Sequence, residues 1–379
     1  MSEHVLSNVA VVLRNEVVHG SVVIRDEVIA DIGQGSSHLP QAIDFEGDYL
    51  IPGFVELHTD NLERHLQPRP GVMWPSASAA VLSHDVQIAG AGITTVFDAV
   101  SVGEYSAASN RRQMIATTVE TLSNPRVREV LKAEHLIHLR CELADPAVME
   151  IYQPIAGNPH VKLVSLMDHT PGQRQWADLE KWRQFNRDKK WTDIEFDAMV
   201  TKRRADQAKH AEIHRRSVIA LARHYGTVMA SHDDTTREHV EEAVAEGIAI
   251  SEFPTTLGAA GHAAKRGMKV IMGAPNIVRG GSHSGNVSAV ELAQRGFLDG
   301  LSSDYVPASL MQAVFQLSGS EGIELPKAVA MISANPTGMV GLADRGELAP
   351  DKRADFSRVR LVDGQPVILG VWREGRRIC

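Results

Sequence analysis

The sequence IPGFVELHTDNLERHLQPRPGVMW, residues 51–74, joins an apolar strand pattern to a dense set of potential ligands. Its apolar run ends in His58 and Asp60, and side chains two apart in a strand point to the same face. The loop that follows adds three basic side chains, Arg64, His65 and Arg69. This stretch predicts a buried strand whose carboxyl end opens onto a polar site.

Seven further apolar runs follow, and stretches with helical spacing separate them. The eight predicted strands cover residues 54–58, 93–100, 135–143, 161–169, 227–233, 248–253, 269–274 and 300–306. Strands that alternate with helices over this length predict an α/β fold, a (β/α)8 TIM-like barrel. An open doubly wound sheet is the alternative, but no G-x-G-x-x-G follows the first strand.

Both ends of the chain have a different pattern, with short alternating strands and Gly or Asp turns. The carboxyl-terminal segment contains a hairpin signal at Asp363–Gly364. We expect a small β-sandwich domain that both termini form, from residues 1–50 and 347–379, around a barrel of residues 51–346. Residues 170–226 are too long for a simple connection and predict a helical excursion; a substrate lid or an oligomer contact is the alternative.

Composition limits the class of protein. The chain has 379 residues, 43% of them hydrophobic, and a net charge of −8, which argues against a nucleic-acid or membrane-surface partner. Two cysteines are too few for a disulfide framework, and no leader or membrane-spanning run is evident. We expect a cytoplasmic protein and leave a homo-oligomer open.

Ligand-type residues occur at the ends of five predicted strands. They are His58, Asp60, Glu142, His169, His232 and Asp304. A single histidine at a strand end is more often structural, but five strands with the same feature predict a site for one or two divalent metal ions. Zinc is expected, with manganese as the alternative. Glu142 is the preferred bridging ligand, Glu56 is expected to orient His58, and Glu252 is a ligand, an orienting group or an ion-pair partner.

A second loop, APNIVRGGSHSGN at residues 274–286, has the composition of an anion site. Glycines let backbone N–H groups approach an anion, and an Arg side chain binds phosphate oxygens in pairs. The side chains expected to bind phosphate here are Arg279, Ser282 and His283. An ordinary Gly-rich connection is the alternative.

The motifs resemble those of the amidohydrolase superfamily along the whole chain. The matching strings are IPGFVELHTD, MASHDD, LSSDYVP and NPTGMVGLADRGELAPDKRADFSRV. ELHTDNLERHLQPRPGVMW, DHTPGQ, MGAPNIVRGGSHSGN and SSDYVPASL are similar to one branch, the ribose-triphosphate diphosphatases of the carbon–phosphorus lyase pathway. Two features depart from the superfamily pattern: Asp60 replaces a histidine, and SEFPTT on the sixth strand lacks one.

The resemblance implies metal-dependent hydrolysis of a phosphorylated small molecule, a ribose 5-triphosphate, to a 5-phosphate and diphosphate. Asp304 would take the proton of the attacking water, and His283 would donate to the departing diphosphate. The basic groups named above would hold the phosphate oxygens. The rival hypotheses are hydrolysis of a cyclic amide, deamination of a nucleobase, and an inactive barrel used for assembly.

Overall fold

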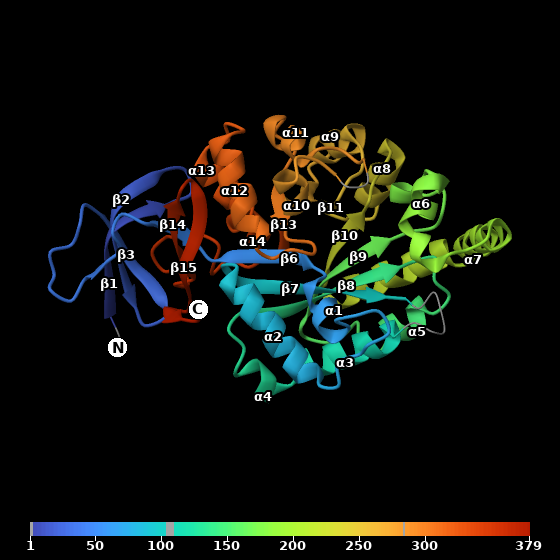
Figure 1. Ribbon diagram of the computed structural model, residues 1–379, viewed down its shortest axis with the longest axis horizontal. Coiled ribbons are helices and arrows are strands. Elements are labelled where there is room, and N and C mark those ends of the chain that lie inside the picture. Colours follow the sequence, from blue (N-terminus) through green and yellow to red (C-terminus); the bar gives the residue numbers. More distant parts are fainter. Residues whose placement is uncertain (1–2, 104–109, 283–284) are drawn as a thin grey trace.

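The computed structural model describes residues 3–103, 110–282 and 285–379. The small β domain lies at one end of the long axis, the barrel lies in the middle, and helices α6 (Leu179–Phe185) and α7 (Asp193–Tyr225) lie at the other end (Figure 1). This arrangement confirms the predicted fold class. The domain boundaries at residues 50 and 346 stay a prediction.

Eight parallel strands form the barrel in chain order, each hydrogen-bonded to the next. They are β6 (Phe54–Thr59), β7 (Ile93–Val102), β8 (Glu134–Glu142), β9 (Val161–Met167), β10 (Val228–His232), β11 (Ile250–Glu252), β12 (Lys269–Gly273) and β13 (Gly300–Ser302). Asp304 closes the ring: its N–H donates to the carbonyl of His58 at 3.1 Å, and its carbonyl accepts from the N–H of Asp60 at 2.7 Å. All eight predicted strands are confirmed.

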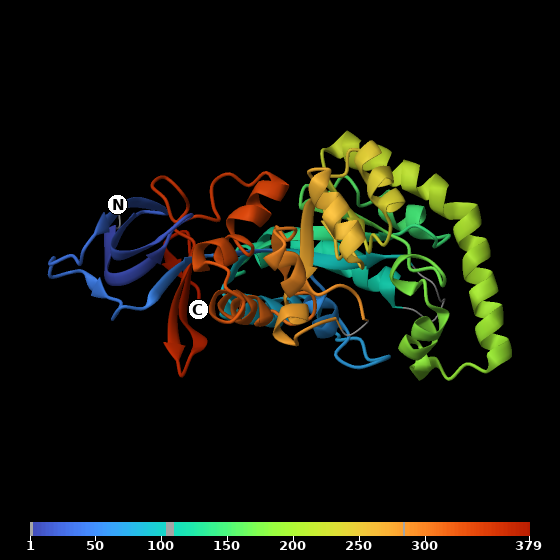
Figure 2. The same ribbon diagram turned by 90° about the horizontal axis from the view of Figure 1, so that it is seen from above.

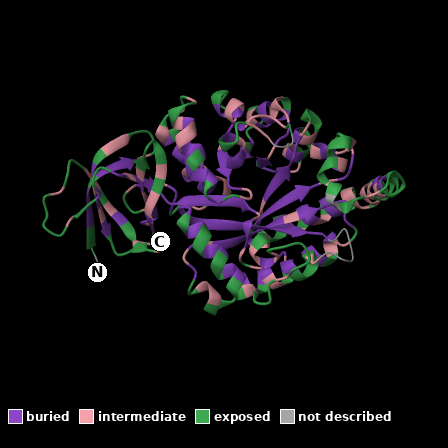
Figure 3. Cartoon of the chain, viewed as in Figure 1, coloured by how far each residue is buried: buried purple, intermediate pink, exposed green. Residues whose placement is uncertain are grey.

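The inside of the barrel is a packed core. Its side chains are Val55, Leu57, Phe97, Leu136, Leu163, Ala230, Ile250 and Ile271. A larger apolar layer lies between the strands and the surrounding helices, and the strands are buried along almost their whole length (Figure 3). Because side chains fill the interior, a ligand site belongs at the strand ends and their loops.

Helices follow the strands, and several begin at a Ser or Thr cap that satisfies otherwise unpaired N–H groups. Ser76, Thr236, Thr256 and Ser288 cap the helices that begin at Ala77, Arg237, Leu257 and Ala289 in this way. The barrel helices are α1 (Asn61–Leu66), α2 (Ala77–Gly90), α3 (Arg111–Ser123), α4 (Pro125–Arg128), α5 (Val148–Tyr152), α8 (Arg237–Ala245), α9 (Leu257–Lys265), α10 (Ala274–Val278), α11 (Ala289–Gln294), α12 (Ser309–Gly319), α13 (Leu325–Ala330) and α14 (Ala334–Val340).

The predicted helical excursion is present between β9 and β10. It comprises η1 (Arg174–Trp176), α6 (Leu179–Phe185), η2 (Arg187–Lys189) and α7 (Asp193–Tyr225). A capping box between Thr192 and Glu195 starts α7, and Gly226 in the left-handed region ends it. The excursion has its own apolar cluster around Trp182 and Phe196, and it extends away from the barrel (Figure 2).

Among the described residues, no helix is both long and apolar enough to cross a membrane.

Both termini pair in one sheet of the small β domain. Its strands are β1 (Glu3–Val12), β2 (Val17–Arg25), β3 (Val28–Gln34), β4 (Ile43–Asp44), β5 (Tyr49–Pro52), β14 (Phe356–Val362), β15 (Gln365–Arg373) and β16 (Arg376–Arg377). The hairpin between β14 and β15 turns at Asp363–Gly364, both with positive φ, as predicted. The antiparallel pair β5 and β14 joins the two ends of the chain.

Candidate active site

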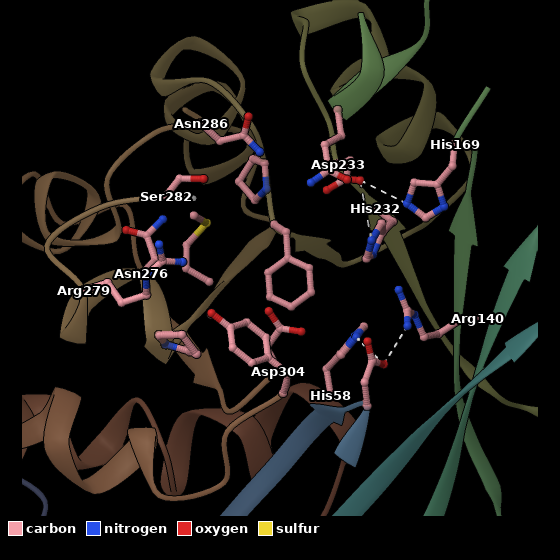
Figure 4. A pocket seen from close by; sticks show the side chains of 18 of the residues that line it. His58, Arg140, His169, His232, Asp233, Asn276, Arg279, Ser282, Asn286 and Asp304 are labelled. Atoms are coloured by element: carbon pink, nitrogen blue, oxygen red, sulfur yellow. Dashed lines mark hydrogen bonds and ion pairs between the residues drawn. The ribbon is translucent and has the colours of Figure 1, made fainter. Parts of the chain in front are cut away.

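A cavity of about 580 Å³ lies at the carboxyl ends of the barrel strands. It is lined by five of the six predicted metal ligands, His58, Asp60, His169, His232 and Asp304. Three predicted phosphate-binding residues, Arg64, Arg279 and Ser282, line the same cavity. Figure 4 shows the candidate ligands on one side, with Arg279, Ser282, Asn276 and Asn286 facing them. The structure therefore brings most of the predicted site together.

The first group of candidate ligands joins β6 to the end of β13. His58, Asp60 and Asp304 each offer one ligand atom, and these atoms lie within 4.8 Å of one another. His58 Nε2 lies 3.5 Å from Asp60 Oδ1. One imidazole with two carboxylates is a hard donor set that suits a divalent cation.

The second group joins β9 to β10 and contains a residue that the sequence analysis missed. His169, His232 and Asp233 also place one ligand atom each within 4.8 Å. Asp233 Oδ2 lies 3.4 Å from His169 Nε2 and 3.7 Å from His232 Nε2. This oxygen is buried without a hydrogen bond among the described residues, a costly state that a bound cation would relieve. The donor set therefore fits a metal ion.

Glu252 sets the direction of two of these imidazoles. Its carboxylate accepts from His58 Nδ1 and from His232 Nδ1, both at 2.7 Å, and from Ser165 Oγ at 2.7 Å. Each ring is left with Nε2 toward the cavity. An outer carboxylate that holds a histidine in this way is typical of metal centres. Of the three roles left open for Glu252, the geometry favours the orienting one.

Glu142 has the same relation to His169. Its Oε2 accepts from His169 Nδ1 at 2.6 Å, and its Oε1 accepts the His169 backbone N–H at 2.8 Å. Glu142 does not line the 580 Å³ cavity. The geometry therefore favours Glu142 as an orienting carboxylate behind His169 rather than the bridging ligand expected from the sequence.

The prediction that Glu56 orients the His58 side chain is wrong. Its carboxylate accepts the backbone N–H of His58 at 2.7 Å and of Ser303 at 2.6 Å, whereas Glu252 binds the His58 ring. The strand alternation is interrupted here, because the pairing of β6 with β7 shifts register between Glu56 and Thr59. Glu56 thus ties the first strand to the last, and its complete burial raises its pKa to about 7.

Arg140 on β8 is a second site residue that was not predicted from the sequence. Its Nη1 donates to Asp60 Oδ1 at 2.6 Å inside the cavity. Burial opposes its charge, but Asp60 and Glu63 keep the pKa of Arg140 above its ordinary value. A fixed cation therefore sits beside the first ligand group and offsets part of its negative charge.

Three residues at the strand ends adopt the left-handed backbone region. These are Asp233 at φ 55°, Phe253 at φ 55° and Asp304 at φ 54°. Asp tolerates this region, but a bulky Phe does so at a cost, and such residues cluster at functional sites. The Phe253 ring packs edge-on against His58 and His232, with centroids at 4.9 and 5.4 Å. The strained turn thus holds an apolar wall against both imidazoles.

Metal binding here is expected to release protons. Burial alone would lower the pKa of His58, but Glu252 raises it to about 10, and Glu142 and Asp233 do the same for His169. Below that pH both rings carry an extra proton, which a metal ion at Nε2 must displace. The apparent affinity for metal should therefore rise with pH. At pH 7, about two protons should be released when both groups of candidate ligands bind an ion. Calorimetry in two buffers of different ionisation heat counts these protons; binding without release would contradict the assignment.

Two predicted phosphate-binding residues lie outside the cavity. His65 Nε2 contacts Gln87 Oε1 at 3.0 Å, and exposed Arg69 pairs through its backbone with Val72. Both are predicted to lie in the loop after β6, but α1 begins at Asn61 and contains His65, and of the three basic residues only Arg64 lines the cavity. His283 lies outside the described residues, so its predicted role stays a prediction.

A further buried cluster is structural. His84, Asp98 and His135 pack between β7, β8 and α2, where Asp98 accepts from both rings at 2.7 Å. Asn61 and Asp85 occupy the remaining ring nitrogens. Burial opposes charge on His135, but Asp98 and Asp85 raise its pKa to about 9. Every ring nitrogen in the cluster is already paired, so the cluster is structural rather than a metal site. Its hydrogen bonds hold α2 onto the barrel.

Comparison with known proteins adds a relative that matches over the full length. No family model matches the sequence. The chain is 44% identical over 377 residues to the α-D-ribose 1-methylphosphonate 5-triphosphate diphosphatase of Escherichia coli (strain K12), covering 99% of this chain and 100% of that protein.

Solved structures share the fold at low sequence identity. A crystal structure of an amidohydrolase is 16% identical with a TM-score of 0.61, covering 99% of this chain and 98% of that one. The 5-methylcytosine deaminase from Klebsiella pneumoniae, liganded with 5-fluorocytosine, is 15% identical with a TM-score of 0.65, covering 99% and 97%. The solved structures show the fold, and the full-length relative shows that this chain is a hydrolase of the α-D-ribose 1-methylphosphonate 5-triphosphate diphosphatase family.

Proposed function

We propose that the chain hydrolyses α-D-ribose 1-methylphosphonate 5-triphosphate to the 5-phosphate and diphosphate, with one or two divalent metal ions. Support comes from one observation above all: two groups of candidate metal ligands face the same cavity as Arg64, Arg279 and Ser282. A polyphosphate needs both kinds of partner, because its charge must be neutralised while an anhydride bond breaks.

His58, Asp60 and Asp304 would hold one ion, and His169, His232 and Asp233 would hold the other. A divalent ion in such a site supplies Lewis acidity, which polarises phosphoryl oxygens and lowers the pKa of water. Zinc suits the mixture of imidazole and carboxylate donors, and manganese is the alternative.

The chain's own groups position the substrate and move the proton. The Asp304 carboxylate accepts a proton from the attacking water, since it faces the cavity on the strand end that closes the barrel. Arg279 and Ser282 bind phosphate oxygens, and Arg64 is held nearby by the carbonyl of Tyr305 at 3.3 Å. His283 is retained in the proposal as a donor to the departing diphosphate. A cytoplasmic location and a homo-oligomer stay predictions.

Arg279→Ala should weaken substrate binding by about 1–3 kcal/mol, the worth of a charged hydrogen bond. Steady-state kinetics of diphosphate release measure this as a rise in KM. Arg69→Ala is the matched control, because exposed Arg69 lies on the segment after α1 and outside the cavity. Equal effects of the two substitutions would remove Arg279 from the phosphate site.

The reaction class is tested by offering the metal-loaded enzyme three kinds of substrate. The proposal expects diphosphate from the ribose 5-triphosphate, and no ammonia or ring-opened product from a nucleobase or a cyclic amide. Chelation should stop diphosphate release, and added metal should restore it. Ammonia release without diphosphate would support the deaminase alternative, and inactivity of the metal-loaded protein on every substrate would support an assembly role.

A further inference from the structure

The catalytic cavity continues into a second lobe beneath the helical excursion. This lobe has a volume of about 670 Å³. Five residues line both spaces: Asp60, Arg140, His169, Gln175 and Phe185. Two of them are candidate metal ligands, so a molecule whose reacting group lies at the candidate metal centre can extend into both lobes.

The second lobe combines cations with aromatic rings. Its basic residues beyond Arg140 are Arg111 at the start of α3, Lys189 in η2 and Arg203 in α7. Its carboxylates beyond Asp60 are Glu63 and Glu142, so four basic side chains of Arg and Lys stand against three carboxylates. The balance of charge therefore favours an anion, although a modest one.

Four aromatic side chains also line the second lobe, namely Trp176, Trp182, Trp191 and Phe185. Phe185 packs against Trp176 with centroids at 4.7 Å, yet 65% of its surface is exposed. An exposed large ring where two lobes meet is a surface for an apolar or amphipathic ligand group. A sugar ring, with its C–H faces, is such a group.

The first lobe has a different character. Beyond the candidate ligands it offers Arg64, Arg279 and the amide or hydroxyl groups of Asn276, Ser282 and Asn286. These donors suit the many oxygens of a diphosphate. The two lobes therefore differ in the way that the two ends of the substrate differ, since one end is a polyanion and the other is a sugar with a small anionic ester.

We propose, resting on the proposed function, that the second lobe binds the ribose 1-methylphosphonate end of the substrate. Phe185 contacts the ribose, and Lys189 and Arg203 bind the phosphonate, which carries one negative charge and a methyl group. The scissile anhydride then lies at the shared residues. One water adds across the P–O–P bond, so that the 5-phosphate stays with the ribose and the diphosphate departs through the first lobe. The helical excursion is thus a specificity element.

Two substrates test this assignment: the 1-methylphosphonate 5-triphosphate, and a 1-O-methyl ribose 5-triphosphate without the phosphonate charge. Wild-type enzyme should prefer the first in kcat/KM by tenfold or more. Lys189→Gln and Arg203→Gln should each reduce this preference by about tenfold, the loss of one charged hydrogen bond. Lys202→Gln is the matched control, because exposed Lys202 lies beside Arg203 on α7 but lines neither lobe.

The ratio of the two kcat/KM values distinguishes a loss of phosphonate recognition from a general loss of activity, since a distorted fold lowers both values alike. Equal use of both substrates by the wild type, or an unchanged ratio in both variants, would overturn the assignment and leave the proposed function standing. Failure of the wild type to release diphosphate from either substrate would instead overturn the proposed function, and this inference with it.

Discussion

Asp304→Asn is expected to lower diphosphate release by about 10²–10⁴-fold, the usual contribution of a general base. The asparagine oxygen can still act as a neutral ligand, but it cannot accept the proton of the attacking water. The backbone hydrogen bonds of this residue to His58 and Asp60 do not involve the side chain, so barrel closure should survive. Turnover and metal content are measured on the same preparation.

Asp363→Asn provides the matched control for this variant. It makes the same chemical change in the hairpin turn of the small β domain, where Asn tolerates positive φ. We expect it to keep full activity. Full activity of Asp304→Asn would remove Asp304 as the base, and loss of metal in that variant would show that its role is ligation.

Glu252→Gln is expected to weaken metal binding by about 10–100-fold, the usual effect of losing an outer carboxylate. One carboxylate accepts from the rings of His58 and His232, which belong to different ligand groups, so both should be affected. The metal-free protein should also lose on the order of 3–5 kcal/mol of unfolding free energy, because a buried charged network loses one partner. Metal titration and denaturant unfolding measure the two effects.

Glu241→Gln is the control for this second variant. Glu241 also pairs with a histidine, His262, at 2.6 Å, but the pair lies on the outer surface between α8 and α9. It should change stability by less than about 1 kcal/mol and leave metal affinity unaltered. Similar metal affinity in Glu252→Gln and wild type would show that Glu252 does not orient the ligands.

Much of the barrel could be predicted because its strands are short apolar runs with a repeated βα order. Such strands are buried on both faces, so their continuous apolar composition identifies them from a single sequence. The carboxyl ends of parallel strands meet at one end of a barrel, which is why His58, His169, His232 and Asp304 could be placed together before any geometry was known.

The errors have local physical causes. Strict alternation predicts that Glu56 and His58 point the same way, and the register shift in β6 breaks that rule. Asp233 directly follows its strand and adopts the left-handed backbone region. The direction of its side chain depends on that backbone angle, which the residue type does not specify. The string SHDD was the one indication in the sequence that an aspartate follows His232 at the strand end. Arg140 shares the parity of Glu142, which predicts that both side chains lie on the same side of β8. The turn into α1 takes His65 away from the cavity.

The central claim is that one site at the strand ends hydrolyses the triphosphate chain of a phosphonate-bearing ribose. Phosphorus NMR of the metal-loaded enzyme with α-D-ribose 1-methylphosphonate 5-triphosphate tests it most directly, because each product gives its own signal. We predict that the 5-phosphate and diphosphate appear together in equal amounts, and that neither appears after chelation. Stepwise release of orthophosphate, or an unchanged triphosphate with metal bound, would contradict the claim.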